Sequence, residues 1–210
     1  VYDGPIMGNV EVPGDKSISH RAILLSMLSI GKTNIENCLF SDDILRTIEV
    51  SRLLGTKISK NSLSLTVDGL VLDGLKKPLG TLNFGNSGTS MRLFMGILAA
   101  QKFECILSGD SSLINRPMDR VADPLIKMGA NIQTTSGRAP INIFPTKGLK
   151  SINHDLQIPS AQIKSAILLA SLFGSGQTTI NTKTKSRDHT EIMLKDFSST
   201  ISFENNRIHI

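Results

Sequence analysis

The residue types best suited to chemistry lie near the beginning of the chain, just before an apolar run at 22–28. Lys16, Ser17, His20 and Arg21 occupy that position, and their spacing predicts the N-terminus of a helix. A helix N-terminus offers free backbone N–H groups and the positive end of the helix dipole, and here it adds two mobile cations, so it attracts an anion. An ordinary helix cap with solvated basic residues is the alternative interpretation.

Two more helix starts of the same kind follow. The second, at 85–90, has two glycines that let a ligand approach the backbone, while Asn86, Ser87 and Thr89 supply hydrogen bonds. The third, at 159–162, reads Pro-Ser-Ala-Gln. Taken singly, the second is explained by a glycine-rich cap and the third by a serine cap. Three such starts in one chain favour an anion site.

A fourth element is Arg116, which precedes a proline at the start of a further helix. A cation there opposes the helix dipole, and this placement makes sense if the arginine faces an anion. The corresponding position is basic again at 185–189 but acidic at 41–43, where Asp42 and Asp43 are expected to be caps, as is Asp188. The segments therefore differ most where a cap can become a binding group.

These starts belong to an internal repeat. Matching Arg21, Arg92 and Lys164 aligns three segments at steps of 71 and 72 residues. Each segment predicts a strand, a helix, a strand, an amphipathic helix and two short strands, with the leading strands at 9–12, 81–84 and 154–158. The pattern predicts a single α/β domain of three βαβαββ units, with approximate threefold symmetry and inward-facing helices around one core.

Composition narrows the kind of partner. The chain has 210 residues and a net charge of +5, which suits an anionic partner. Its basic residues are spread out and it has no Trp and one Tyr, which favours a small metabolite over single-stranded nucleic acid. Cys38 and Cys105 lack CxxC spacing and predict core thiols in a reducing cytoplasm. We expect no metal site, no signal peptide and no membrane span.

Five motifs together carry a resemblance to a known family. They are PGDKSISHRAILL, FGNSGTSMRL, INRPMDRVADPLIKMGA, IPSAQIKSAILLA and KSRDHTE, and they cover nearly the whole chain. In this order they resemble the 5-enolpyruvylshikimate-3-phosphate (EPSP) synthases, the 3-phosphoshikimate 1-carboxyvinyltransferases, and look more like bacterial members than plant ones. The resemblance implies an inside-out barrel fold and transfer of enolpyruvyl from phosphoenolpyruvate to the 5-hydroxyl of shikimate 3-phosphate, without a cofactor. This reaction belongs to the shikimate pathway of aromatic amino-acid biosynthesis.

The resemblance also implies roles for individual residues. Lys16 would act as the catalytic residue and contact both substrates, and Gln162 would border both. The group expected to bind shikimate 3-phosphate comprises Lys16, Ser17, Arg21, Ser160, Ala161, Gln162 and Ser186. The group expected to bind phosphoenolpyruvate comprises Lys16, Asn86, Gly88, Arg116 and Gln162.

Length is the departure from the family, whose members carry two domains of this design. The resemblance implies that 1–210 is the N-terminal domain, with 1–9 belonging to the hinge or the other domain, and that the C-terminal domain with the proton-transferring acids is absent. Such a chain, expected to be monomeric, should bind shikimate 3-phosphate weakly without turnover.

Three alternatives remain open. The sister enzyme acting on UDP-N-acetylglucosamine typically has Lys-Asn where this chain has Lys16-Ser17, and a reactive cysteine near Arg116. A non-catalytic RNA-binding or RNA-processing domain would have a similar α/β architecture and would bind in a salt-sensitive way. The third alternative is a structural fragment that needs its partner domain to fold well.

Overall fold

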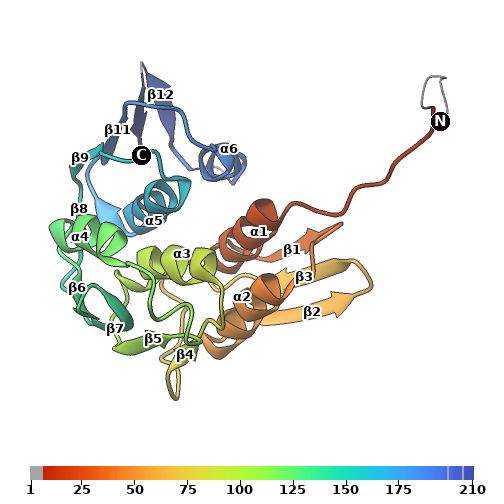
Figure 1. Ribbon diagram of the computed structural model, residues 1–210, viewed down its shortest axis with the longest axis horizontal. Helices are drawn as coiled ribbons and strands as arrows, with labels where there is room; N and C mark the ends of the chain where they lie inside the picture. Colours follow the sequence, from red (N-terminus) through yellow and green to blue (C-terminus); the bar gives the residue numbers. More distant parts are fainter. Residues whose placement is uncertain (1–6, 198, 205) are drawn as a thin grey trace.

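The computed structural model describes residues 7–197, 199–204 and 206–210, which form six helices and thirteen strands (Figure 1). The helices are α1 Lys16–Leu28, α2 Asp42–Leu53, α3 Gly88–Leu98, α4 Asp119–Lys127, α5 Ala161–Ser171 and α6 His189–Asp196. The strands up to the middle of the chain are β1 Lys32–Ile35, β2 Lys57–Asn61, β3 Ser64–Asp68, β4 Leu82–Asn83, β5 Cys105–Ser108, β6 Asn131–Thr135 and β7 Arg138–Phe144. The remaining strands are β8 Leu149–Lys150, β9 Asn153–Leu156, β10 Gly174–Ser175, β11 Thr179–Thr182, β12 Ser202–Glu204 and β13 Arg207–His209.

The three predicted helix starts are all capped in the same way. Asp15 caps α1 by accepting from the N–H of Ile18 at 2.8 Å. Ser87 caps α3 and Ser160 caps α5, each accepting from the N–H three residues further on. The caps fix where each helix begins and leave other N–H groups of the first turn free of intrahelical partners.

The second and third units share one sheet topology, which confirms the βαβαββ repeat for them. Their strand orders are β4-β5-β7-β6 and β9-β11-β13-β12. In each sheet the first two strands are parallel, and the other two pairings are antiparallel. A parallel pair needs a crossover, and α3 and α5 supply it.

The first unit departs from the prediction. Its sheet has only three strands, ordered β1-β3-β2, and the strand expected at 9–12 is wrong: described residues 7–15 contain no strand. Val10 and Val12 alternate as a strand requires, but they are 85% and 72% exposed, and the segment runs away from the body of the molecule (Figure 1). A strand needs a neighbouring edge as well as an alternating pattern.

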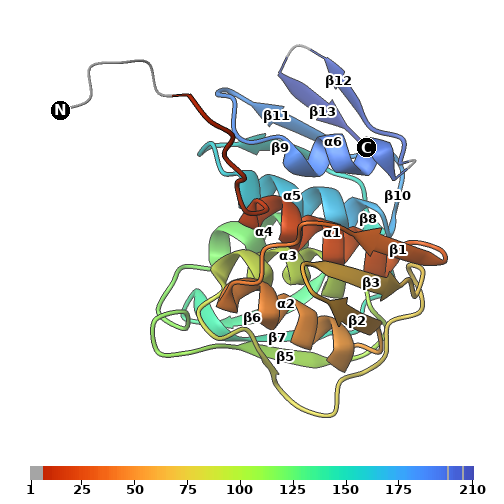
Figure 2. The same ribbon diagram turned by 90° about the vertical axis from the view of Figure 1, so that its right-hand side faces the viewer.

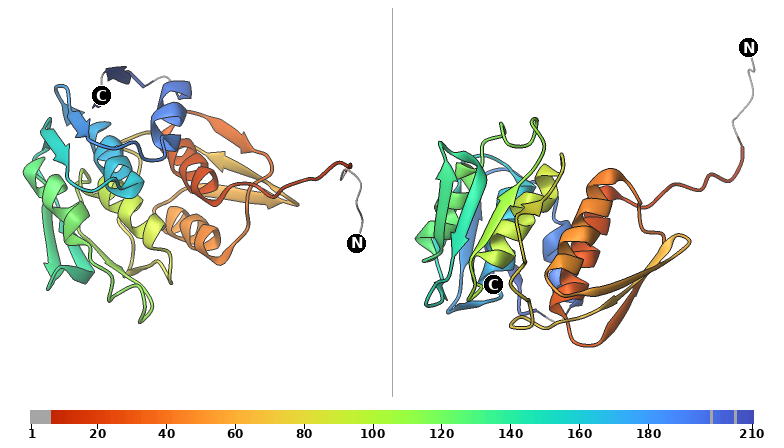
Figure 3. Two further views of the ribbon diagram at one scale, coloured as in Figure 1. Left: turned by 45° about the horizontal axis from the view of Figure 1, so that its top comes forward. Right: turned by 90° about the horizontal axis from the view of Figure 1, so that it is seen from below.

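Helices lie inside and sheets outside. Seven consecutive α5 residues from Lys164 to Ala170 are buried, and α3 is buried on nearly every side. By contrast, β3 and β7 alternate between buried and more exposed residues, so each sheet keeps one face toward the helices. Figures 2 and 3 show α1, α3 and α5 grouped between the sheets. Within the described residues, no helix combines the length and apolarity needed to cross a bilayer.

Among the described helices, α3 and α5 share the most extensive contact, and it depends on Gly96. A methyl group built on Gly96 would lie 2.2 Å from the carbonyl oxygen of Ala166, which is a steric overlap with backbone. Glycine therefore lets the two helices approach closely, and this approach brings their N-termini near each other.

Replacing Gly96 with alanine should destabilise the fold. Alanine favours a helix by up to about 1 kcal/mol relative to glycine. The overlap with the Ala166 carbonyl should outweigh that gain and lower the free energy of unfolding by about 1–3 kcal/mol. Urea unfolding measures the change. Gly80→Ala is the matched control, because a methyl there meets nothing within 4 Å; equal stability of the two variants would contradict the close contact.

Candidate anion-binding site

Arg21 is the centre of the first helix start. It is 4% exposed and is held by three helices. Its Nη1 donates to the carbonyl of Ser17 at 2.9 Å within α1, its Nη2 donates to Ser165 Oγ of α5 at 2.7 Å, and its Nε donates to Thr190 Oγ1 of α6. Three of its five N–H groups are thus used within the described chain, and each terminal nitrogen keeps one more donor.

The charge of Arg21 is stabilised only in part by the protein. Burial lowers the pKa of Arg21, Glu191 acts in the opposite direction, and nearby Arg187 lowers the pKa further. Arg187 reaches this place from the loop before α6, where its Nη1 donates to Ser17 Oγ at 3.0 Å. Two guanidinium groups therefore lie near each other at the start of α1, where an incoming anion would relieve their repulsion.

The second helix start gathers three arginines. Arg116 Nη2 donates to Asn86 Oδ1, and a methyl group on Gly88 would lie 3.0 Å from Nη1 of both Arg116 and Arg92. Burial lowers the pKa of Arg92, and the charges of Arg116 and Arg120 lower it further. None of the three takes a carboxylate partner among the described residues. Gly88 thus leaves room for a concentrated positive charge.

The third helix start is joined to the second by Gln162. Its Oε1 accepts from Arg92 Nη1 at 2.7 Å, and its Nε2 donates to Thr89 Oγ1 at 2.9 Å. A cavity of about 210 Å³ opens here, with Gln162, Arg92, Arg120 and Ser160 among the residues that line it. Ala161 is the first residue of α5.

Ser186 lies one residue before Arg187 and its Oγ is buried without a hydrogen-bond partner in the described chain. It lines a separate cavity of about 290 Å³ that also contains Lys164 and Glu191. The structure therefore places Ser186 next to the first helix start through its neighbour Arg187, rather than through a contact of its own.

Lys16 is engaged by an acid that the sequence suggests only as a cap. Its Nζ lies 2.9 Å from Asp43 Oδ2, and the lysine side chain is half exposed. The cap prediction is wrong for these two aspartates: Ser41 is the N-cap of α2, and Asp42 and Asp43 lie in its first turn, where a carboxylate still interacts favourably with the helix dipole. Asp188 is the N-cap of α6 as predicted, without a side-chain hydrogen bond in the described chain. Asp43 additionally holds the Lys16 ammonium between α1 and α2.

A buried polar chain joins the first and second starts. His20 Nδ1 lies 2.7 Å from Thr47 Oγ1, which in turn donates to Ser90 Oγ of α3 at 2.8 Å. His20 Nε2 is buried with no partner among the described residues, so the neutral tautomer with the proton on Nδ1 is favoured: it leaves an acceptor unpaired rather than a donor. Burial lowers the pKa of His20 to about 4.

Several contributing residues escape prediction from the sequence. The residues that contact Arg21 or Ser17 at the first helix start are Arg187, Ser165 and Thr190. In the sequence, Ser165 and Thr190 look like ordinary helix residues. Arg92 is visible in the sequence only as a repeat marker, although it binds Gln162. Arg187 lies in the KSRDHTE motif, which is the signal that would have found it.

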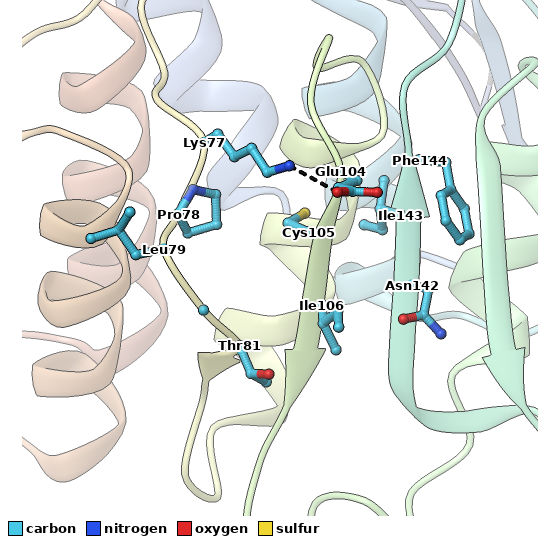
Figure 4. A pocket seen from close by; sticks show the side chains of 11 residues that line it. Lys77, Pro78, Leu79, Thr81, Glu104, Cys105, Ile106, Asn142, Ile143 and Phe144 are labelled. Carbon is cyan, nitrogen blue, oxygen red and sulfur yellow. Dashed lines mark hydrogen bonds and ion pairs between the residues drawn. The ribbon is translucent and has the colours of Figure 1, made fainter.

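A pocket elsewhere on the surface lacks this chemistry. A cavity of about 380 Å³ lies on the second sheet between the segment before β4 and strands β5 and β7 (Figure 4). Its charged residues, Lys77 and Glu104, pair with each other at 2.8 Å. The pair leaves no uncompensated cation in that pocket, so the helix starts are the better candidate.

The repeat and its helix starts define the class of the chain: an α/β domain that gathers cations at helix N-termini. Comparison with known proteins agrees. A sequence model of the family described as EPSP synthase (3-phosphoshikimate 1-carboxyvinyltransferase) matches residues 2–210, so the chain belongs to the EPSP synthase family.

Individual relatives show how much of the family's length is present. The chain is 50% identical over 201 residues to the 3-phosphoshikimate 1-carboxyvinyltransferase of Vesicomyosocius okutanii subsp. Calyptogena okutanii, covering 96% of this chain and 46% of that protein. It is 44% identical over 207 residues to that of Listeria welshimeri, covering 98% and 48%. EPSP synthase from Acinetobacter baumannii matches in structure with a TM-score of 0.94 and 44% identity, covering 97% and 46%. The chain thus spans about half the length of these relatives.

The buried His20 should make stability depend on pH. Its pKa is about 4 in the fold and about 6.5 in the unfolded chain, so the unfolded chain takes up a proton that the fold excludes as pH falls. Above pH 6.5 the histidine is neutral in both states and costs no stability. Between pH 6.5 and pH 4 the free energy of unfolding falls progressively, by about 3 kcal/mol in total. Urea unfolding at several pH values measures it.

His20→Asn should flatten this dependence, since an amide does not titrate there. His154→Gln is the comparison. Burial lowers the pKa of His154 as well, although its ring is only half-buried. An unchanged acid-dependent loss in His20→Asn would show that another group is responsible.

Proposed function

We propose that this chain is the N-terminal domain of an EPSP synthase, and that it binds shikimate 3-phosphate and part of phosphoenolpyruvate. The observation that carries the proposal is the separation of charge into two groups. Arg21 and Arg187 lie at the first helix start, while Arg92, Arg116 and Arg120 lie at the second. Both groups are bonded to α5, Arg21 through Ser165 and Arg92 through Gln162, and this arrangement suits two anionic substrates that must react side by side.

Shikimate 3-phosphate would occupy the first and third starts. Arg21 offers its two remaining N–H groups, and Lys16 and Ser17 lie one turn earlier on α1. The start of α5 comprises Ser160, Ala161 and Gln162, and Ser186 precedes Arg187. The phosphate would therefore meet helix N–H groups and a guanidinium together. To the residues expected from the sequence we add Arg187, because it already contacts Ser17.

Phosphoenolpyruvate would occupy the second start. Arg116 is held by Asn86 and passes close to Gly88, which leaves space for an anion against the backbone. Guanidinium groups can bind a phosphate or carboxylate in a bidentate way. Gln162 would border this substrate as well, because it bonds Arg92 and Thr89 on α3.

The reaction joins the enolpyruvyl carbon to the 5-hydroxyl oxygen and releases phosphate through a tetrahedral adduct. The residues of this chain would bring two mutually repelling anions together and stabilise the charge that develops between them. Lys16 is proposed to contact both substrates, with Asp43 orienting its ammonium. On the family resemblance, the acids that transfer protons lie in the other half, so this chain alone should not turn over.

We infer that the enzyme works as a monomer in a reducing compartment, the cytoplasm. Both cysteines support the compartment, since Cys38 and Cys105 are buried free thiols, and burial raises the pKa of Cys105 to about 12. We also propose that residues 1–9 are a hinge or a part of the other domain; of these, 1–6 lie outside the described residues, and 7–9 lie in the segment before α1 that runs away from the body of the molecule (Figure 1). The match to carboxyvinyltransferases favours this function over RNA binding, and over the sister enzyme because Ser17 follows Lys16.

Arg21→Ala should weaken binding of shikimate 3-phosphate. Loss of a charge-assisted contact costs about 1.5–3 kcal/mol, which is about 10- to 150-fold in Kd. Isothermal titration of the 210-residue chain measures it. Arg52→Ala is the control, because Arg52 lies at the far end of α2 and, within the described residues, its side chain donates to the carbonyl of Ile58 alone. Equal affinity of both variants would contradict the site, and salt-sensitive binding of RNA without binding of shikimate 3-phosphate would support the alternative.

Gly88→Ala should affect the other substrate. The added methyl would press on Nη1 of both Arg116 and Arg92, whose side chains can move, so the fold should persist while the two guanidinium groups are displaced. We expect a roughly tenfold weaker affinity for phosphoenolpyruvate, titrated with shikimate 3-phosphate present, equivalent to one charge-assisted hydrogen bond. If shikimate 3-phosphate binding falls instead and phosphoenolpyruvate binding holds, the assignment of the two starts is reversed.

A further inference from the structure

Lys164 and Glu191 form an ion pair inside the domain, between α5 and α6. Their side chains are 4% and 1% exposed. Neither residue is among those we assign to a substrate. Lys164 occupies the same repeat position as Arg21 and Arg92, but it alone of the three has a carboxylate partner among the described residues.

The pair is adjacent in sequence to the groups that hold Arg21. Ser165 follows Lys164, and Thr190 precedes Glu191. Ser165 Oγ and Thr190 Oγ1 lie 2.6 Å apart, and both accept hydrogen bonds from Arg21. The spacing of α5 and α6 therefore decides whether both hydroxyls reach one guanidinium.

These hydrogen bonds run in one direction, from donor to acceptor. Ser165 donates its proton to the carbonyl of Ala161, so Thr190 must be the donor in the bond between the two hydroxyls. Arg21 thus donates to Thr190, and Thr190 donates to Ser165. Each hydroxyl has one proton. A shift of α5 or α6 would therefore break a hydrogen bond that no other donor among these three residues can replace.

Stability alone does not account for a buried pair. Taking both charges out of water costs about as much as their attraction returns, and well-packed apolar residues are often as stable. An ion pair differs from an apolar contact in being directional. One carboxylate oxygen, Glu191 Oε2, is buried without a partner in the described chain, and the charge of Glu191 also acts on Arg21.

We propose that Lys164 and Glu191 are positioning residues: their ion pair fixes α6 against α5 so that Ser165 and Thr190 hold the Arg21 guanidinium in the orientation that receives shikimate 3-phosphate. The ligand part of this inference rests on the proposed function. The orientation of Arg21 can be tested separately from any ligand.

The test removes both charges together, because a single substitution would leave a buried unpaired charge. Lys164→Met/Glu191→Met keeps similar volumes and should fold with cooperative unfolding. Two readouts follow Arg21: solvent exchange of its Nε–H in nitrogen-15 NMR, and the Kd of shikimate 3-phosphate by titration calorimetry. We expect exchange about tenfold faster and a Kd about tenfold higher than in the unmodified chain, as for loss of one charge-assisted contact.

Three further variants separate positioning from general stability. Lys164→Arg preserves the pair and should restore both readouts to near the values of the unmodified chain. Ile143→Ala removes a fully buried side chain from β7 in the second unit; it should lower stability without speeding exchange at Arg21. Glu191→Gln serves if the double variant does not fold: it leaves the Lys164 charge without a counterion, but it is nearly isosteric and its amide oxygen can still accept a hydrogen bond from Lys164. It should move both readouts in the same direction.

The outcomes are distinct. A folded double variant, or Glu191→Gln, with unchanged exchange and unchanged affinity overturns the positioning role. Faster exchange in Ile143→Ala equal to that in the double variant overturns it too, because the effect is then general destabilisation. If the unmodified chain fails to bind shikimate 3-phosphate, the proposed function fails, and the Arg21 exchange measurement still decides the positioning role.

Discussion

The arrangement of this domain depends on holding positive charge at the N-termini of buried helices. A cation there opposes the helix dipole and loses its hydration, so each one needs hydrogen-bond acceptors or a counterion within the protein. The repeat places three such cations at equivalent positions, and a different kind of group stabilises each of them. Arg21 is held by neutral hydroxyls, Arg92 by an amide oxygen and a carbonyl, and Lys164 by a carboxylate. The two cations held by neutral groups keep their charge available to a ligand, while the third is neutralised inside the fold.

Helix packing converts this local chemistry into one site. Gly96 allows α3 and α5 to approach to backbone contact, and Gln162 then needs to span only the gap between their first turns. The chain from His20 through Thr47 to Ser90 makes the equivalent connection between α1 and α3. Because these connections are short hydrogen bonds, small displacements of one helix are transmitted to the groups at the start of the next.

Local signals explain what the sequence predicts well. The caps Ser87 and Ser160, the glycines at the second start and the apolar runs locate the buried helices, and these features act over a few residues. The α/β class and the βαβαββ order of elements in two units follow from the repeat. The strand expected at 9–12 failed because pairing is not a local property, and nothing in Val10 and Val12 specifies a neighbouring edge. The contacts of Arg21 lie 144 and 169 residues away, at a serine and a threonine that carry no signal of their own.

The uneven use of one repeat also suits the proposed role, in which this chain binds anions and the other half of the enzyme transfers protons. Hydroxyls and amides orient Arg21 and Arg92 without cancelling their charge, so guanidinium groups lie close to each other at both helix starts. Under the proposed function, binding the first anion would relieve that repulsion at one helix start, and the second group of arginines would then offset the repulsion between that anion and the next. Holding charge apart in this way favours association of two anions. Neither His20 nor Asp43 suits proton transfer there, since burial lowers the pKa of His20 to about 4 and Asp43 is engaged with Lys16. Under the proposed function, proton transfer would therefore come from the other half of the enzyme, whereas binding would not.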